Sequence, residues 1–133
     1  MKYKEVNEHY ESGKLKCQYY EGENGDECGE SRGYHANGQL WWLTIKLNDI
    51  DYGEVKIFTE DGTLYHHYLM DDEENELATV IEFGKPDTYS EEQLIEIAKE
   101  HNLPLLSELP KTEAELTHWN LKYPDFPCLP IES

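Results

Sequence analysis

Three segments in the first half of the chain share one pattern of residues, and this repeat constrains the fold more than any other feature. The shared positions are a Glu, a Gly eight residues later and a Leu two residues after that Gly. The glycines, Gly13, Gly38 and Gly62, lie 25 and then 24 residues apart. A nearly constant period in the range of about 20–50 residues indicates one supersecondary unit that is repeated along the chain.

The turn residues predict that each unit is a β-hairpin. Asn37-Gly38 and Asp61-Gly62 are favoured pairs for two-residue type I′ turns, in which both residues have positive φ. Ser12-Gly13 is a weaker version of the same signal. The flanking segments are rich in Tyr, Val, Ile, Phe, Trp and Thr, which suit a pleated, half-buried surface. With return turns at 23–27 and 48–52, we expect an antiparallel meander of about six or seven strands.

The order of Gly-Glu, an aromatic residue, Asn/Asp-Gly and Leu at this spacing resembles the bacterial MORN-like repeat proteins, including an antitoxin-type family built from such hairpins. The resemblance covers about residues 4–70, which is half of the chain. Members of this group are often antitoxins or immunity proteins that are encoded beside a secreted toxin. The resemblance therefore implies a protein that binds and neutralises a toxin.

The second half of the chain predicts a different kind of structure. Residues 76–83 are expected to form the last strand. Ser90 begins a capping box for a helix over about 91–101, and Thr112 begins a second capping box for a short helix that ends near residue 119. Five of the six prolines lie at residue 104 or later, so we expect an extended tail.

The predicted fold class is therefore α+β and mainly β. It is an antiparallel meander of repeated β-hairpins with one or two C-terminal helices and a Pro-rich extended tail. We expect a single domain over residues 1–133, with the repeat meander at 4–84 and the helical cap and tail at 85–133.

Strand pairing predicts which side chains share a face of the meander. A two-residue turn at 61–62 and a four-residue return at 49–52 place Leu43 beside Phe58, and Phe58 beside Tyr65. We expect this face to be the core, covered by the first helix. It also carries Trp41, Ile45, Leu47 and Leu69.

The opposite face is a mixture of polar and aromatic residues. Its aromatic members include Trp42 and Tyr68, which are of the type enriched at protein interfaces. An alternative is that the tail after residue 104 packs over this face.

Charge is the strongest signal of function. The chain has 29 Asp and Glu residues against 11 Lys and Arg residues, a formal net charge of −18. No Lys or Arg occurs from Ile57 to Gly84, where eight acids are found. Such a charge opposes folding by self-repulsion, repels nucleic acids and anionic membranes, and favours a basic protein partner.

We interpret the acidic clusters as a binding surface for a basic toxin, with a nuclease as the expected class. Dense carboxylates can imitate the phosphates that a nuclease recognises and can speed association by electrostatic steering. The alternative for each cluster is a solvated loop. The candidate partner-binding residues are Asp71, Asp72, Glu73, Glu74, Glu76, Glu23, Asp26 and Glu27, with Trp42 and Tyr68.

No residue pattern indicates catalysis, a cofactor or a metal. The spacing of acids over residues 71–76 is not that of an EF-hand. His66 and His67 are adjacent in a predicted strand, so they must point to opposite faces. The expectation is therefore that the protein is not an enzyme. A small enzyme with a His/Cys or carboxylate site and a MORN-type scaffold are the alternatives.

The remaining features favour a cytoplasmic protein. Cys17, Cys28 and Cys128 form neither an even set nor a C-x-x-C motif, so we expect incidental or buried thiols in a reducing compartment. The first eight residues lack the apolar run of a secretory signal, and no stretch is long and apolar enough to span a membrane. The sequence leaves the oligomeric state open, and we expect a monomer.

Overall fold

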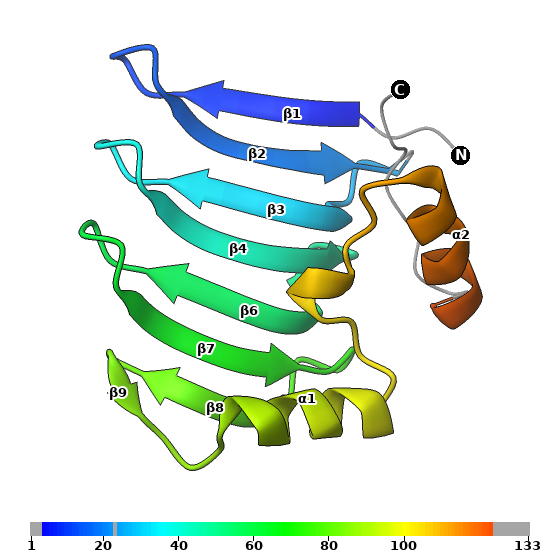
Figure 1. The fold of residues 1–133 in the computed structure, drawn as a ribbon. Coiled ribbons are helices and arrows are strands. Elements are labelled where there is room, and N and C mark those ends of the chain that lie inside the picture. Colours follow the sequence, from blue (N-terminus) through cyan, green and yellow to red (C-terminus); the bar gives the residue numbers. More distant parts are fainter. Residues whose placement is uncertain (1–3, 23, 124–133) are drawn as a thin grey trace.

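The fold is a nine-stranded antiparallel sheet with two helices at its C-terminal end (Figure 1). The computed structural model describes residues 4–22 and 24–123. The strands are β1 (Lys4–His9), β2 (Leu15–Glu21), β3 (Gly29–Tyr34), β4 (Leu40–Leu47), β5 (Ile50–Asp51), β6 (Gly53–Phe58), β7 (Leu64–Met70), β8 (Glu76–Glu82) and β9 (Lys85–Pro86). The helices are α1 (Glu91–Glu100), the short 3-10 helix η1 (Leu106–Glu108) and α2 (Glu113–Lys122).

The predicted fold class is confirmed. The strand order is β1-β2-β3-β4-β6-β7-β8-β9, with β5 paired beside β4, so nearly every strand pairs with its neighbour in sequence. Two strands that the sequence did not predict, β5 and β9, have only two residues each. The expected strand at 76–83 is β8, which ends one residue earlier and is followed by β9.

The three predicted hairpin tips exist, but their turn type differs from the prediction. The tip glycines have left-handed backbones, with φ of 91° at Gly13, 90° at Gly38 and 89° at Gly62. Asn37 and Asp61 are not among the described residues with positive φ, so the prediction of type I′ turns is wrong. The register shifts at the base of each hairpin. This is the arrangement of a three-residue loop that ends in a left-handed glycine.

A side-chain hydrogen bond explains why Asn or Asp precedes the tip glycine. The Asn37 side-chain oxygen accepts a hydrogen bond from the Gln39 amide at 3.0 Å. The Asp61 carboxylate accepts one from the Thr63 amide at 3.1 Å. These local bonds favour a turn at each tip. The residue pair thus marks the loop correctly although its backbone geometry is not type I′.

Type I′ geometry occurs instead at two other loops. Asn48 and Asp49, between β4 and β5, have φ of 50° and 73°. Phe83 and Gly84, between β8 and β9, have φ of 52° and 78°. Each pair is a two-residue connection with positive φ at both positions, as type I′ requires.

The strand register differs from the prediction for the same reason. Leu43 lies opposite Lys56 rather than Phe58, because β5 occupies part of what we expected to be a simple four-residue return. Phe58 lies opposite Leu64 rather than Tyr65, because the hairpin has a bulge at its base. The first shift is by two residues, an even number, so Leu43 stays on the predicted face.

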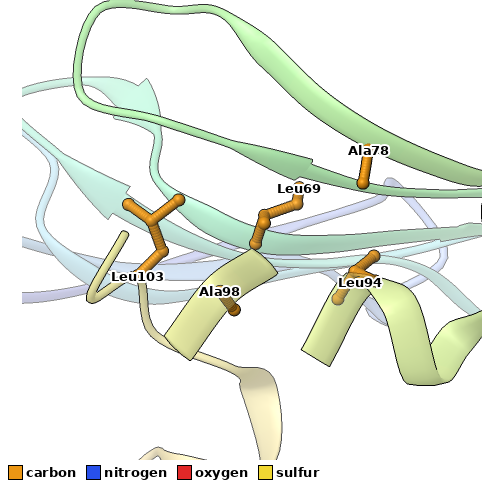
Figure 2. Close-up of a cluster of buried hydrophobic side chains, with 5 residues drawn as sticks. All are labelled: Leu69, Ala78, Leu94, Ala98 and Leu103. Atoms are coloured by element: carbon orange, nitrogen blue, oxygen red, sulfur yellow. The ribbon is translucent and has the colours of Figure 1, made fainter. Parts of the chain in front are cut away.

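Two clusters of buried side chains form the core on the helix-covered face. In the first, Leu94 and Ala98 of α1 pack on Leu69 and Ala78 of the sheet, beside Leu103 (Figure 2). Burial of a side chain the size of Leu stabilises a fold by roughly 1.5–3 kcal/mol. The predicted cover by the Leu94 helix is therefore confirmed at Leu69, whereas Trp41 and Tyr65, predicted on the same face, are 40 % and 36 % exposed.

The second cluster lies further along the same face. Here Ile45 of β4 is fully buried beneath Leu109, Trp119 and Tyr123. Residues 104–123 therefore pack against the core face, and the alternative in which the tail covers the opposite face is wrong for this stretch. The rest of the predicted extended tail, 124–133, lies outside the described residues.

Helix capping was predicted well at α1 and in part at α2. The Gln93 amide donates to the Ser90 hydroxyl at 3.1 Å and the Ser90 amide donates to the Gln93 side chain at 2.8 Å, which completes the predicted capping box. At α2 the Thr112 hydroxyl accepts from the Glu115 amide, but the Glu115 carboxylate accepts from the Lys111 amide instead. α2 runs to residue 122, three residues beyond the prediction.

Candidate functional site

The meander places its return loops together at one end of the sheet. Because successive strands are antiparallel, the tips at 10–14, 35–39 and 59–63 lie at one end and the returns at 22–28, 48–52 and 71–75 lie at the other (Figure 1). Neighbouring strands are about 4.8 Å apart, so successive returns, two strands apart, are spaced by about 10 Å. We call the line of the three returns the return edge.

The return edge gathers most of the predicted acidic residues. Its carboxylates are Glu21, Asp26, Glu27, Asp49, Asp51, Asp71, Asp72, Glu73, Glu74 and Glu76. One cation, Lys46, lies beside them, with its Nζ 2.9 Å from Asp51 Oδ1. Two clusters that are about 45 residues apart in sequence thus share one edge. Glu23, also predicted, lies outside the described residues.

The sequence interpretation missed Asp49 and Asp51. Both lie in the second return, a segment that the sequence marks only as a turn. The signal was present, since alternating antiparallel strands must bring every second connection to the same end of a sheet.

Direct hydrogen bonds join the first return to the second. The Glu27 amide donates to Asp49 Oδ1 at 2.7 Å, and the Asp49 amide donates to the Glu27 carbonyl oxygen at 3.1 Å. These contacts hold the two loops in one arrangement.

This arrangement crowds carboxylates against one another. Burial raises the pKa of Glu27, and repulsion from Asp49, Glu21 and Asp51 adds to this effect despite the opposing influence of Lys46. Partial desolvation raises the pKa of Asp26, as do a hydrogen bond shared with the Asp49 carboxyl group and repulsion from it.

The third return has a different internal structure. The Asp71 carboxylate accepts hydrogen bonds from the Glu73 and Asn75 amides, both at 2.8 Å. The Asn75 amide is the main cause that lowers the pKa of Asp71. Asp71 therefore orders the loop, while Asp72, Glu73 and Glu74 are exposed. Glu76, at the start of β8, is exposed as well.

Of the two predicted aromatic contacts, Tyr68 lies near the return edge and Trp42 does not. Burial raises the pKa of Tyr68, and so do the charges of Asp51 and Glu76, which places its hydroxyl within electrostatic reach of the edge. Tyr68 is half-buried, opposite Val55 and Thr79 on the face away from the helices.

Trp42 has a structural role in the sheet. A Cβ atom at Gly33, directly opposite, would lie 2.3 Å from the Trp42 ring, so the ring packs flat on the glycine. The indole Nε1 donates to the Ser31 hydroxyl at 3.2 Å. Trp42 is therefore fixed over β3, with its ring half-buried.

The histidine and cysteine side chains are held in separate surroundings. His67 is 2 % exposed on the core face, whereas His66 lies on the other face with its ring centroid 5.1 Å from that of Phe83. The predicted opposite orientation is confirmed. Cys17 and Cys28 are free and buried, and burial raises the pKa of Cys17 to about 11, with a hydrogen bond to Glu8 adding to the effect. Cys128 lies outside the described residues.

Two further observations concern other classes of site. Within residues 4–22 and 24–123, no group of three or more His, Cys, Asp or Glu side chains has the arrangement of a metal site. In the same part of the chain, neither α1 nor α2 has the length and apolar character that crossing a bilayer requires.

Comparisons with known proteins leave the return edge without a counterpart. No family model, no curated protein sequence and no solved structure matches this chain. Functional inference therefore rests on the residues and their arrangement.

Proposed function

We propose that the protein is a cytoplasmic binding protein of the immunity or antitoxin type, which neutralises a basic toxin by direct contact through the return edge. The observation that carries this proposal is the alignment of three acidic loops along one edge, from segments about 45 residues apart in sequence. A nuclease is the proposed toxin class, because its nucleic-acid site is basic and accepts dense negative charge.

The energetics of the edge support a role in binding. Carboxylates that repel one another, such as that of Glu27 and its neighbours Glu21 and Asp51, oppose folding. A partner that brings Lys or Arg side chains to the edge would relieve this repulsion. The return spacing of about 10 Å suits a row of cations rather than a single one.

The proposal assigns different roles to the predicted residues. Asp72, Glu73 and Glu74 project from the third return as exposed charges for steering and contact. Asp26 and Glu27 supply the same charge from the first return. The remaining members are Glu76 and Glu23 as further acids, Asp71 as the residue that orders its loop, Tyr68 as the adjacent anchor, and Trp42 as support for the sheet.

The proposal also implies that the protein acts by binding and not by catalysis. An inhibitor of this kind needs a stable surface of complementary charge, and it needs no nucleophile, cofactor or metal.

The direct test is co-expression with the protein encoded by a neighbouring toxin-like reading frame. The expected result is restored growth and co-purification of the two chains from cells that express both. A folded protein that neither protects the cells nor binds that toxin would contradict the proposal.

A further inference from the structure

The segment of residues 103–123, which we call the cap, leaves α1, crosses the core face through η1 and ends with α2 (Figure 1). Polar contacts attach it to the start of β6. The Glu54 amide donates to the Pro104 carbonyl oxygen at 3.0 Å. The Leu106 amide donates to Glu54 Oε1 at 2.9 Å. The other carboxylate oxygen, Oε2, lies 2.6 Å from His67 Nε2 on the neighbouring strand β7.

The sheet topology explains why the cap attaches at this point. β5 pairs with the end of β4, so β4 and β6 pair only through Trp42–Ile57 and Leu43–Lys56. The start of β6 is therefore open to the cap on that side. A Cβ atom at Gly53 would lie 2.3 Å from the Pro104 carbonyl oxygen, so the absence of a side chain there permits the close approach.

The attachment depends on a buried charged group. Glu54 is 6 % exposed and His67 is 2 % exposed. Burial alone would raise the pKa of Glu54, but hydrogen bonds from His67 and the Leu106 amide, with the nearby Lys56, lower it. A buried carboxylate is tolerated only when such partners are present. Removal of one partner strongly destabilises the fold.

The cap contacts the sheet less extensively than neighbouring strands contact one another. Two pockets that open to solvent border it, one of about 340 Å³ between η1 and α2 and one of about 240 Å³ lined by α1, the chain between α1 and η1, and Lys122. Regions with fewer contacts to the rest of a fold open at lower free energy.

We propose that the cap opens from the sheet as one unit while the meander stays folded, and that the Glu54–His67 pair is the latch that holds it closed. Both latch residues belong to the sheet. Glu54 accepts the hydrogen bond of the Leu106 amide, and His67 fixes Glu54 from the neighbouring strand. Opening breaks the bonds to Pro104 and Leu106 and uncovers Ile45, which lies at the return end of β4.

The test is hydrogen exchange measured by mass spectrometry on the full chain. Glu54→Gln removes the charge of the latch, and Glu8→Gln is the control, because Glu8 also accepts a side-chain hydrogen bond but lies at β1, opposite Cys17. We expect amides of 103–123 to exchange about tenfold or more faster in Glu54→Gln, since hydrogen bonds to charged groups are among the stronger ones. Amides of β3, β4, β7 and β8 should gain no more than the cap amides do, because a global opening also breaks the latch, and the control should match the wild type.

A second measurement uses the wild-type protein and remains decisive if Glu54→Gln does not fold. At increasing low concentrations of denaturant, the cap amides should share one opening free energy that is lower than that of the strand amides. Unchanged cap exchange in a folded Glu54→Gln variant would overturn the proposal. So would wild-type cap amides that exchange only through the same opening as the strands.

Discussion

The two ends of the sheet are built from the same kind of element and differ in almost every other respect. At the tip end, three loops repeat one geometry, with left-handed glycines whose φ values lie within two degrees of one another. At the return end, the loops at 22–28, 48–52 and 71–75 differ in length, hydrogen bonding and backbone conformation. What the returns share is negative charge.

One position at the return end places a charged residue in a backbone conformation that is costly outside glycine. In the third return, Glu74 adopts φ of 63°, a left-handed conformation of the kind that the tips assign to glycine. A non-glycine residue in this region costs roughly 1–2 kcal/mol. The tips therefore repeat one glycine geometry, whereas the third return places a charged residue in a left-handed conformation.

The largest predicted effect tests the tip end. Gly62→Val forces a β-branched residue into φ of 89° and should destabilise the protein by about 2 kcal/mol in urea unfolding. The matched control is Gly22→Ala in a return, where the added Cβ atom would come no closer than 3.5 Å to any neighbour and should change the stability by less than about 0.5 kcal/mol. Equal effects of the two substitutions would remove the distinction between the ends.

A second prediction has the opposite sign. Glu74→Gly should stabilise the free protein by about 0.5–1 kcal/mol, because glycine adopts the left-handed conformation without the steric cost. The larger conformational entropy that glycine loses on folding offsets only part of this gain. Glu74→Ala removes the same charge but keeps the strained backbone. Urea unfolding of both variants separates the two contributions, and a glycine variant no more stable than the alanine variant would show that Glu74 is not strained.

The smallest predicted effect concerns the crowded carboxylates. The pKa of Glu27 is raised in the folded state above its ordinary value of 4.5, so the folded protein holds this proton more tightly than the unfolded chain does. The stability contributed by Glu27 is thus full below pH 4.5 and is lost as the pH rises through the folded pKa.

Glu27→Gln should therefore stabilise the protein at pH 7 by a few tenths of a kcal/mol, about the size of an exposed charge interaction. The same substitution should give no gain at pH 4. Urea unfolding at the two pH values measures the difference. A gain of equal size at both pH values would mean that the cost of ionising Glu27, from burial and from neighbouring charges, is not the cause.

The sequence predicted those parts of the fold that depend on local chemistry. The tip glycines fix a backbone conformation that other residues resist, and Ser90 with Gln93 satisfies the free amides at the start of α1. Both signals act over a few residues. They could therefore be interpreted from the chain without knowledge of its tertiary structure.

Other features depend on contacts between distant segments and could not be predicted in this way. Glu54 lies within a repeat, where it reads as an ordinary strand residue, and its partner Leu106 is 52 residues away. The short strand β5 changes the register between β4 and β6, and no local pattern distinguished it from a turn. Asp49 joins the acidic edge because the meander places its return beside Glu27, so its place there follows from the predicted strand order and not from a local pattern.

The most direct test of the return edge as a binding surface is the rate of association with the basic toxin at low and high salt. The edge variant combines Asp72→Asn, Glu73→Gln and Glu74→Gln, and it leaves Asp71 in place because that carboxylate orders the loop. The control variant removes three negative charges elsewhere, through Glu11→Gln, Glu60→Gln and Glu96→Gln, all at exposed positions.

The edge variant should associate about tenfold more slowly at low salt, and its rate should depend less steeply on salt concentration, because part of the steering field is gone. The control variant should lose much less. Equal rates and equal salt dependence for the two variants would contradict the claim that the return edge meets the toxin.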